Sequence, residues 1–316
     1  MGLLVEGQWQ DQWYDTSKSS GRFIRESAQF HDALGTVSFP VEPHRYHLYV
    51  SYACPWAHRT LIMRHLKGLE PLIGVTSVIP EMLEHGWVYN PPEPHYGYHY
   101  HHQLYTQHDP LYSGRVTVPV LWDTQQHCIV NNESSEIIRQ FNRCFNALTE
   151  NHEDYYPAAL QEEIEQWNQQ IYHAINNGVY RCGFATSQSA YEEACQTLFS
   201  MLDQLEQHLS HHAYLTGNYL TEADIRLFTT LIRFDAVYFG HFKCNQKQLC
   251  DYPNLWDYTK SIYQFRDIAQ TVQFDQIKTH YYYSHGQINP SRIVPLGPDL
   301  SDLQIPAKRP QAKVMC

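Results

Sequence analysis

A cysteine followed by a proline, Cys54-Pro55, is a pair of residues with an evident chemical use. It lies between a segment with the alternation of a strand and one with helical spacing. Proline suits the first helical position, where its missing N–H costs nothing, so Cys54 is expected to be the N-cap. The free N–H groups and the positive end of the helix dipole would then favour the thiolate, the nucleophilic form, and lower the thiol pKa below its ordinary value of about 8.5. Composition alone favours the alternative, a buried and inert cysteine, but the surrounding pattern favours a reactive thiol.

A second motif, Thr117-Val118-Pro119-Val120, has a proline at the start of an apolar run. In thioredoxin-like domains a proline at this place is typically cis, and it exposes the backbone N–H and C=O of the preceding residue. A peptide ligand can then pair with Val118 as a strand would. The alternative is an ordinary proline on an edge strand.

A third motif, Asn131-Asn132-Glu133-Ser134-Ser135, stands at the start of a predicted helix. Backbone N–H groups at such a helix start can hold a carboxylate, and the Glu133 side chain can pair with an ammonium group. The head group of an α-amino acid needs both. A plain N-terminal cap with an acidic first turn explains the same residues equally well.

Alternating histidines and tyrosines fill the segment 95–102, which makes it a rival candidate for a metal site. No cysteine or carboxylate completes a tight ligand spacing there. The segment also belongs to residues 80–113, which five prolines interrupt and which we predict to be a long inserted loop. We therefore predict no metal.

The surrounding patterns indicate a thioredoxin-like α/β unit followed by helices. Residues 46–50 alternate as a half-buried strand, a helix follows as far as Gly68, and residues 72–79, 116–122 and 129–130 form further strands before a helix near Glu133. From about residue 155 apolar residues recur at intervals of three and four residues, as they do along a helix. Thr221 with Asp224 resembles a capping box. We predict an N-terminal extension (1–45), a thioredoxin-like domain (46–150), a helical domain (151–270) and a C-terminal extension (271–316).

Composition excludes other classes of function. The formal net charge of −11 argues against a nucleic-acid partner, and the sequence contains neither a signal peptide nor an apolar run of the roughly 20 residues that a membrane span needs. The eight cysteines contain no Cys-x-x-Cys pair, so neither a zinc ribbon nor a dithiol site is indicated. These features predict a soluble, cytoplasmic protein with reduced thiols.

The three motifs together resemble the glutathione site of the glutathione-transferase fold. The chain further resembles the glutathionyl-hydroquinone reductases, also called Xi-class glutathione transferases. Nearly the whole chain shares the resemblance, through Ala53-Cys54-Pro55-Trp56-Ala57-His58-Arg59, Gly86-Trp87, Thr117-Val118-Pro119-Val120-Leu121-Trp122-Asp123, Asn132-Glu133-Ser134, Asn177-Gly178-Val179-Tyr180, Gly183-Phe184-Ala185, His280-Tyr281-Tyr282, Ser284-His285, Asn289-Pro290 and Ile293-Val294-Pro295-Leu296-Gly297-Pro298. The tyrosine-rich tail with its Asn-Pro and Val-Pro-x-Gly-Pro motifs is more specific than the first block, which fits several thiol-type transferases.

This resemblance implies a glutathione-transferase fold, namely a thioredoxin-like domain plus an all-α domain, and a homodimer. It implies that Cys54 is the nucleophile, that Tyr180 is the proton donor, and that Tyr238 and Tyr281 lie near the sulfur; core packing is the alternative for the three tyrosines. The C-terminal extension would contribute to the active site. Glutathione, the co-substrate, would be held by Trp87, Arg115, Val116, Thr117, Val118, Glu133 and Ser134.

The implied reaction reduces glutathionyl-hydroquinones, quinone-derived small molecules, to hydroquinones. Cys54 would take the glutathionyl group as a mixed disulfide, and a second glutathione would release oxidised glutathione. A single thiol suffices because glutathione itself resolves the disulfide. Two other interpretations stay open: a cysteine-type transferase acting in dehydroascorbate reduction or general thiol transfer, and a non-catalytic binding module of the same fold.

Overall fold

The computed structural model describes residues 2–316, and the chain within it divides into two compact units. The first contains the residues up to Tyr14, Glu26–His152 and Gln273–Arg292, and the second contains Asp15–Arg25, Glu153–Val272 and Ile293–Cys316. Both predicted extensions are thus divided between the units. We describe each unit by itself.

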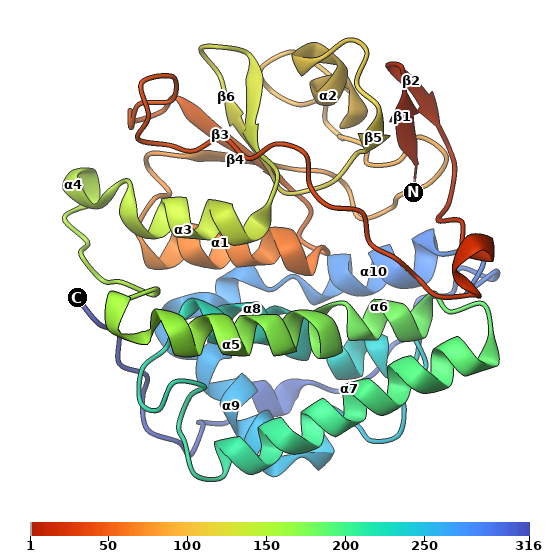
Figure 1. Ribbon diagram of the computed structural model, residues 1–316, viewed down its shortest axis with the longest axis vertical. Helices are drawn as coiled ribbons and strands as arrows, with labels where there is room; N and C mark the ends of the chain where they lie inside the picture. The colour runs from red at the N-terminus through yellow and green to blue at the C-terminus, as the bar shows by residue number, and fades with distance from the viewer. Residues whose placement is uncertain (1) are drawn as a thin grey trace. The chain divides into compact units, whose positions relative to one another are not determined.

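The first unit is thioredoxin-like, as predicted. Its central sheet has the strand order β4-β3-β6-β7, in which β4 is parallel to β3 and the other neighbours are antiparallel. The helices α1 and α3 pack side by side next to this sheet (Figure 1). The elements of this unit are β1 (Leu3–Val5), β2 (Gln8–Gln10), β3 (Tyr46–Val50), α1 (Pro55–Leu66), β4 (Gly74–Ser77), α2 (His102–His108), β5 (Gly114–Arg115), β6 (Val120–Asp123), β7 (Cys128–Asn131), α3 (Ser134–Arg143), α4 (Asn146–Thr149) and α10 (Phe274–Ser284).

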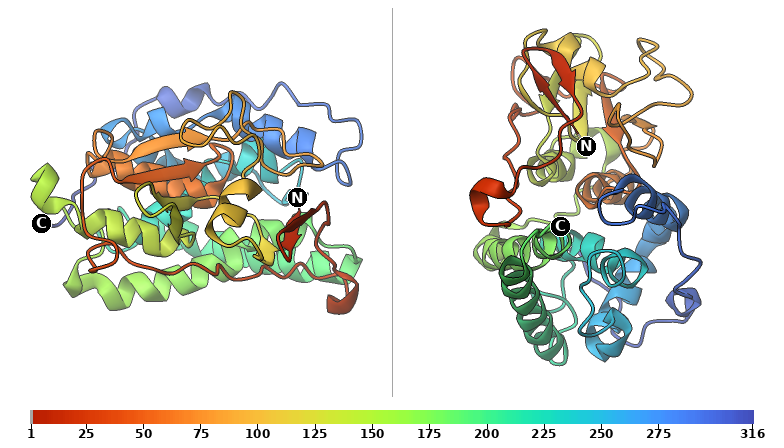
Figure 2. Two further views of the ribbon diagram at one scale, coloured as in Figure 1. Left: turned by 90° about the horizontal axis from the view of Figure 1, so that it is seen from above. Right: turned by 90° about the vertical axis from the view of Figure 1, so that its right-hand side faces the viewer.

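The second unit is a bundle of helices (Figures 1 and 2). Here α6 packs on α7, α5 on α8, and α7 on α9. Its main helices are α5 (Gln161–Ile171), α6 (Gly178–Gly183), α7 (Gln188–Leu209), α8 (Glu222–Leu231) and α9 (Pro253–Tyr263), with π-helical turns at Tyr172–Asn176 and Phe234–Tyr238 and 3₁₀ turns at Ser17–Ser19, Ala158–Leu160, Leu249–Asp251, Phe265–Thr271 and Ser301–Gln304.

The predicted capping box at Thr221 and Asp224 is confirmed at the start of α8. The Asp224 carboxylate accepts hydrogen bonds from the Thr221 backbone N–H at 2.8 Å, the Thr221 hydroxyl at 3.0 Å, the Leu215 N–H at 3.0 Å and the Tyr258 hydroxyl at 2.8 Å. Asp224 is fully buried, so this carboxylate joins the start of α8 to a preceding turn and to α9.

The strand β3 is buried on both faces, which corrects the expectation of a half-buried strand. Residues of the segment 80–113 cover the side chains that were expected to face solvent. The Tyr49 hydroxyl donates to Glu93 at 3.0 Å, and a ring nitrogen of His47 lies 3.1 Å from one of His95. The His/Tyr-rich segment is therefore part of the interior packing of this unit.

Other predicted segments contain more regular structure than their patterns indicated. The inserted loop 80–113 contains α2, whose buried residues Leu104 and Tyr105 are too few to show a helical period. The N-terminal extension contributes β1 and β2, which form a small sheet with β5, and the C-terminal extension contains α10. The apolar run 116–122 is a strand only from Val120 onward. In residues 2–316 no helix is long and apolar enough to cross a membrane.

Candidate active site

Cys54 is the N-cap residue of α1, as predicted, and Pro55 occupies the first helical position. The backbone of Cys54 is extended (φ −75°, ψ 121°), and its carbonyl accepts the helical hydrogen bond from His58 at 2.9 Å. The side chain is half-buried, and its Sγ lies 3.6 Å from the carbonyl oxygen of Val118. The sulfur thus lies at the positive end of the helix, where a thiolate is favoured.

The peptide bond between Val118 and Pro119 is cis, which confirms that prediction. Thr117, just before it, is held by two side chains of the segment 80–113. Its carbonyl oxygen accepts from His101 Nε2 at 2.9 Å and from the Tyr105 hydroxyl at 2.9 Å. This role of His101 and Tyr105 was not predicted, because the alternating histidines around residues 95–102 suggested only a metal site.

Glu133 is the N-cap of α3, and its Oε1 accepts from the backbone N–H and the hydroxyl of Ser135, each at 2.9 Å. A carboxylate offers about four acceptor positions, so this cap is compatible with a second, cationic partner. The buried Ser134 hydroxyl accepts a long hydrogen bond of 3.4 Å from Arg59 of α1. The helix α1, which Cys54 caps, is thereby linked to the start of α3.

Trp87 and Tyr281 are joined through His280, which belongs to the quoted motif His280-Tyr281-Tyr282 but was not predicted to be a site residue. The Trp87 ring stacks on the His280 ring with 4.8 Å between centroids, and the Tyr281 ring meets the same imidazole edge-on at 5.1 Å. His280 Nδ1 also lies 2.9 Å from the Pro80 carbonyl oxygen. The helix α10 is therefore anchored on the segment that carries Trp87.

Arg115 and Val116 have partners within the thioredoxin-like unit. The Arg115 guanidinium pairs with Glu26 at 3.3 Å, donates to the carbonyl of Gln12 at 2.7 Å, and lies 4.3 Å from the centre of the Tyr14 ring. Val116 is buried. Arg115 thus holds the N-terminal segment in place, and its contact with glutathione stays a prediction.

Tyr180 and Tyr238 belong to the helical unit, with 6.1 Å between their ring centroids. Tyr180 is 8% exposed and Tyr238 is fully buried. The Arg25 guanidinium carbon lies 4.9 Å from the centre of the Tyr180 ring, and its Nε donates to the Asn177 side chain at 2.7 Å. Of the two tyrosines, Tyr180 has the greater access to solvent and a cation beside its ring.

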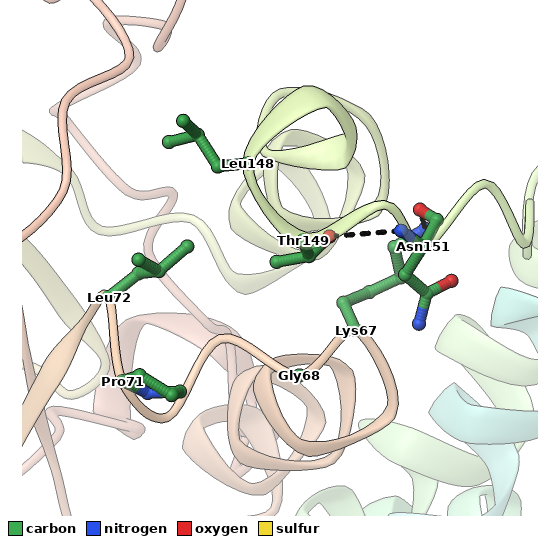
Figure 3. A pocket seen from close by; sticks show the side chains of 7 residues that line it. All are labelled: Lys67, Gly68, Pro71, Leu72, Leu148, Thr149 and Asn151. Carbon is green, nitrogen blue, oxygen red and sulfur yellow. Dashed lines mark hydrogen bonds between the residues drawn. The ribbon is translucent and has the colours of Figure 1, made fainter.

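A cavity of about 320 Å³ lies at the opposite end of α1 from Cys54. Figure 3 shows the side chains that line it. The helix has 12 residues, so the two ends are separated by about 18 Å. Its lining residues are Lys67, Gly68, Pro71, Leu72, Leu148, Thr149 and Asn151. Lys67 donates to the Asn151 carbonyl at 2.9 Å. The lining includes none of the residues to which the sequence patterns assign catalysis or glutathione binding, so we assign the cavity no catalytic role.

The histidines of the segment 95–102 were the rival candidate for a metal site. Across residues 2–316, no group of three or more His, Cys, Asp or Glu side chains is placed to hold a metal ion. Burial lowers the pKa of both His101 and His102 to about 4, so both are neutral near pH 7.

Family profiles match both units. Residues 53–144 match the N-terminal domain of glutathione S-transferases, and residues 188–261 match the C-terminal domain. The fold, the N-cap cysteine and the cis-proline loop are thus those of a thiol-type glutathione transferase.

Individual relatives narrow the class further. The chain is 54% identical over 313 residues to the glutathionyl-hydroquinone reductase YqjG of Escherichia coli (strain K12), covering 94% of this chain and 95% of that protein. It is 52% identical over 303 residues to the glutathionyl-hydroquinone reductase PcpF of Sphingobium chlorophenolicum, covering 94% and 96%. The glutathione-bound structure of YqjG matches with a TM-score of 0.89 and 51% identity over 97% of this chain and 98% of that one. A Xi-class transferase from Natrialba magadii matches with a TM-score of 0.90 and 44% identity, covering 98% and 96%. The chain belongs to the glutathionyl-hydroquinone reductase family, the Xi class of glutathione transferases.

Proposed function

We propose that this protein reduces glutathionyl-hydroquinones to hydroquinones at the expense of glutathione. The observation that carries the proposal is the placement of Cys54 at the start of α1, with its sulfur 3.6 Å from the backbone carbonyl of the residue before the cis-proline. A nucleophilic sulfur beside a backbone segment that can pair with a peptide suits a thiol-containing tripeptide. Two relatives that are more than 50% identical in sequence to this chain are named for that activity.

In the first step, the Cys54 thiolate attacks the sulfur of the glutathionyl group. The carbon–sulfur bond breaks, an S–S bond forms, and the electron pair of the broken bond remains on the aromatic carbon, which takes up a proton. We assign that proton to the Tyr180 hydroxyl, with Tyr238 and Tyr281 as the further tyrosines of the site. The hydroquinone then leaves.

In the second step, the thiolate of a second glutathione attacks the mixed disulfide, releases oxidised glutathione and restores the Cys54 thiolate. The two electrons that reduced the aromatic carbon therefore come from two glutathione sulfurs, the one that was bonded to that carbon and the one of the second glutathione. We assign the binding of glutathione to Val118 for its backbone, to Glu133 and Ser134 for its α-amino acid head group, and to Trp87, Arg115, Val116 and Thr117 around them.

The test is turnover of a glutathionyl-hydroquinone, compared with conjugation of glutathione to an electrophilic aryl halide. We expect one hydroquinone and one oxidised glutathione for each glutathionyl-hydroquinone and glutathione consumed, with conjugation much slower. Conjugation without release of hydroquinone would contradict the proposal.

We further propose that the protein acts in the cytoplasm as a homodimer, with quinone-derived small molecules as its substrates. In residues 2–316, which include all eight cysteines, no disulfide is formed, and a reducing compartment preserves this state. Analytical ultracentrifugation tests the dimer, which a single monomeric species at micromolar concentration would contradict.

A further inference from the structure

The hydroxyl group of Tyr105, on α2, lies between the two backbone segments to which we assign glutathione binding. It is 2.9 Å from the carbonyl oxygen of Thr117 and 3.2 Å from the Thr117 backbone nitrogen, just before Val118. It is also 3.2 Å from Nδ2 of Asn132, just before Glu133. Tyr105 is fully buried, so its hydroxyl contacts both segments from within the protein interior.

The hydrogen-bonding capacity of this hydroxyl is used in full by three shorter contacts, and the Thr117 hydroxyl oxygen lies 3.3 Å from it as well. Because a carbonyl oxygen only accepts, the phenol proton goes to Thr117. The two lone pairs of the hydroxyl oxygen are left to accept from the Thr117 N–H and from the Asn132 amide. Asn132 is itself fixed, since its backbone N–H donates to the Phe30 carbonyl and its side-chain oxygen accepts from the Phe30 N–H, both at 3.1 Å.

His101 supports the same carbonyl from a second direction. Its Nε2 lies 2.9 Å from the Thr117 oxygen, and its Nδ1 lies 2.6 Å from the Tyr89 hydroxyl. The carbonyl only accepts, so Nε2 carries the proton. Burial lowers the pKa of His101 to about 4, so the ring is neutral near pH 7 and Nδ1 accepts from Tyr89. The Thr117 carbonyl therefore has two buried donors.

The segment that supplies these groups is itself anchored to the central sheet. Its buried Glu93 accepts from the Tyr49 hydroxyl of β3 and from the backbone N–H of His95 at 3.0 Å each. The segment that donates to Thr117 and accepts from Asn132 is therefore itself held against the central sheet by hydrogen bonds.

We propose that Tyr105 and His101 are positioning residues for glutathione, which fix the relative placement of Val118 and the Glu133-Ser134 helix start without touching the ligand. We call the two residues the Tyr105–His101 clamp. This inference rests on the proposed function, because it assigns both segments to one tripeptide. It also gives the His/Tyr-rich segment a role that its composition did not reveal.

The experiment measures the equilibrium dissociation constant of S-methylglutathione, which cannot form a mixed disulfide, for the full-length protein and for Tyr105→Phe. Phenylalanine keeps the ring and removes only the hydroxyl. We expect a rise of about tenfold in the dissociation constant, equivalent to about 1.4 kcal/mol. The KM for glutathione should rise in parallel, while kcat at saturation changes by less than about twofold.

Tyr46→Phe is the matched control, since Tyr46 is also buried in this unit and its hydroxyl donates to the Pro40 carbonyl at 2.7 Å. It should lower the thermal midpoint without changing the dissociation constant. A folded Tyr105→Phe that binds as tightly as the natural protein would overturn the proposal. So would a Tyr46→Phe that weakens binding equally, because the effect would then be one of general stability.

A second variant keeps the test informative if Tyr105→Phe does not fold. The double variant Tyr89→Phe/His101→Leu removes both partners of one buried hydrogen bond and one of the two donors to Thr117. We expect the dissociation constant to rise by about threefold to fivefold; an unchanged value would again overturn the proposal. A natural protein that binds S-methylglutathione but does not release hydroquinone would refute the proposed function and leave the clamp standing.

Discussion

The thiol of Cys54 donates a hydrogen bond to the backbone carbonyl of Val118, with 3.6 Å between sulfur and oxygen. A thiolate has no proton to donate, so ionisation of Cys54 ends this interaction. The Val118 carbonyl has two lone pairs, so it can accept from an N–H group of a bound peptide in either state. Ionisation of Cys54 frees the acceptor position that the thiol occupied, so the nucleophile and the backbone binding group meet in a single contact.

Replacing Cys54 by serine should abolish reductase turnover while glutathione affinity stays nearly unchanged. Serine can keep the position beside Val118 but cannot form a mixed disulfide, so we expect a loss of at least about 10³-fold in kcat. Steady-state kinetics measures the turnover and calorimetry measures the glutathione affinity. The control is Cys250→Ser, at an exposed cysteine. A Cys54→Ser variant that turns over substrate as fast as the unsubstituted protein would contradict the mechanism.

Cys54 should react with iodoacetamide at lower pH than an ordinary thiol. The start of α1 stabilises the thiolate, so the midpoint of the rate–pH profile should lie below about 8.5. Cys128 is the internal comparison, because burial raises its pKa to about 11. Mass spectrometry of the alkylated peptides at pH 7 should find Cys54 modified well before Cys128, and the reverse order would refute the poised thiolate.

Tyr180→Phe should slow the reductive step more than the exchange with glutathione. Phenylalanine keeps the packed ring but cannot supply a proton, and general acid catalysis is typically worth about 10²–10⁴ in rate. Single-turnover mixing without free glutathione separates hydroquinone release from the second step.

Tyr214→Phe is the control for Tyr180→Phe, because it removes a buried phenol that donates to the Pro310 carbonyl at 3.2 Å in the same unit. Unchanged hydroquinone release in Tyr180→Phe would assign that tyrosine to core packing and make Tyr281 the next candidate donor.

Asp224→Ala should destabilise the helical unit by about 3 kcal/mol or more, because several buried donors lose their acceptor at once. The bonds concerned are those from Leu215, Thr221 and Tyr258. Urea unfolding followed by circular dichroism measures the change. The exposed Asp203→Ala should cost less than about 1 kcal/mol, and equal losses in the two variants would rule out this account of the capping box.

Because of His47, the free energy of unfolding should decrease as the pH is lowered below neutrality. Burial is the main cause that lowers its pKa from 6.5 to about 3 in the folded state. Between these values the unfolded chain binds a proton that the folded chain does not, so the free energy of unfolding decreases as pH falls from about 6.5 toward 3.

In His47→Asn the free energy of unfolding should depend less steeply on pH in this range, by the equivalent of about one bound proton. Denaturant unfolding at a series of pH values measures this slope. The side chain of His47 also lies 2.8 Å from the Thr76 hydroxyl, so some stability is lost at neutral pH as well. The exposed His211→Asn controls for the loss of an imidazole. An unchanged slope in His47→Asn would refute the assignment.

Local patterns predicted the parts of the site that local physics decides. Cys54 is an N-cap because a proline follows it, and Glu133 caps the next helix. Both features depend on residues adjacent in the sequence, whereas the cis peptide at Val118-Pro119 was expected from the thioredoxin-like pattern. The capping box at Thr221 belongs to the same group.

Long-range contacts could not be predicted in this way. Tyr105 meets Asn132 across 27 residues, and Arg115 meets Gln12 across 103. No periodicity encodes such pairs, because they depend on how the chain returns to itself. The short helix α2 was missed for a related reason: only Leu104 and Tyr105 are buried within it.

The two π-helical turns of the helical unit, Tyr172–Asn176 and Phe234–Tyr238, bear on how this chain can change in evolution. One turn leads into α6, which carries Tyr180, and the other ends at Tyr238. A π turn contains one residue more than an α turn. Deleting that residue would restore the ordinary helix but rotate every later side chain of the helix by about 100°. In these two stretches selection therefore acts on the number of residues as well as on their identity, so substitutions there are more readily tolerated than insertions or deletions.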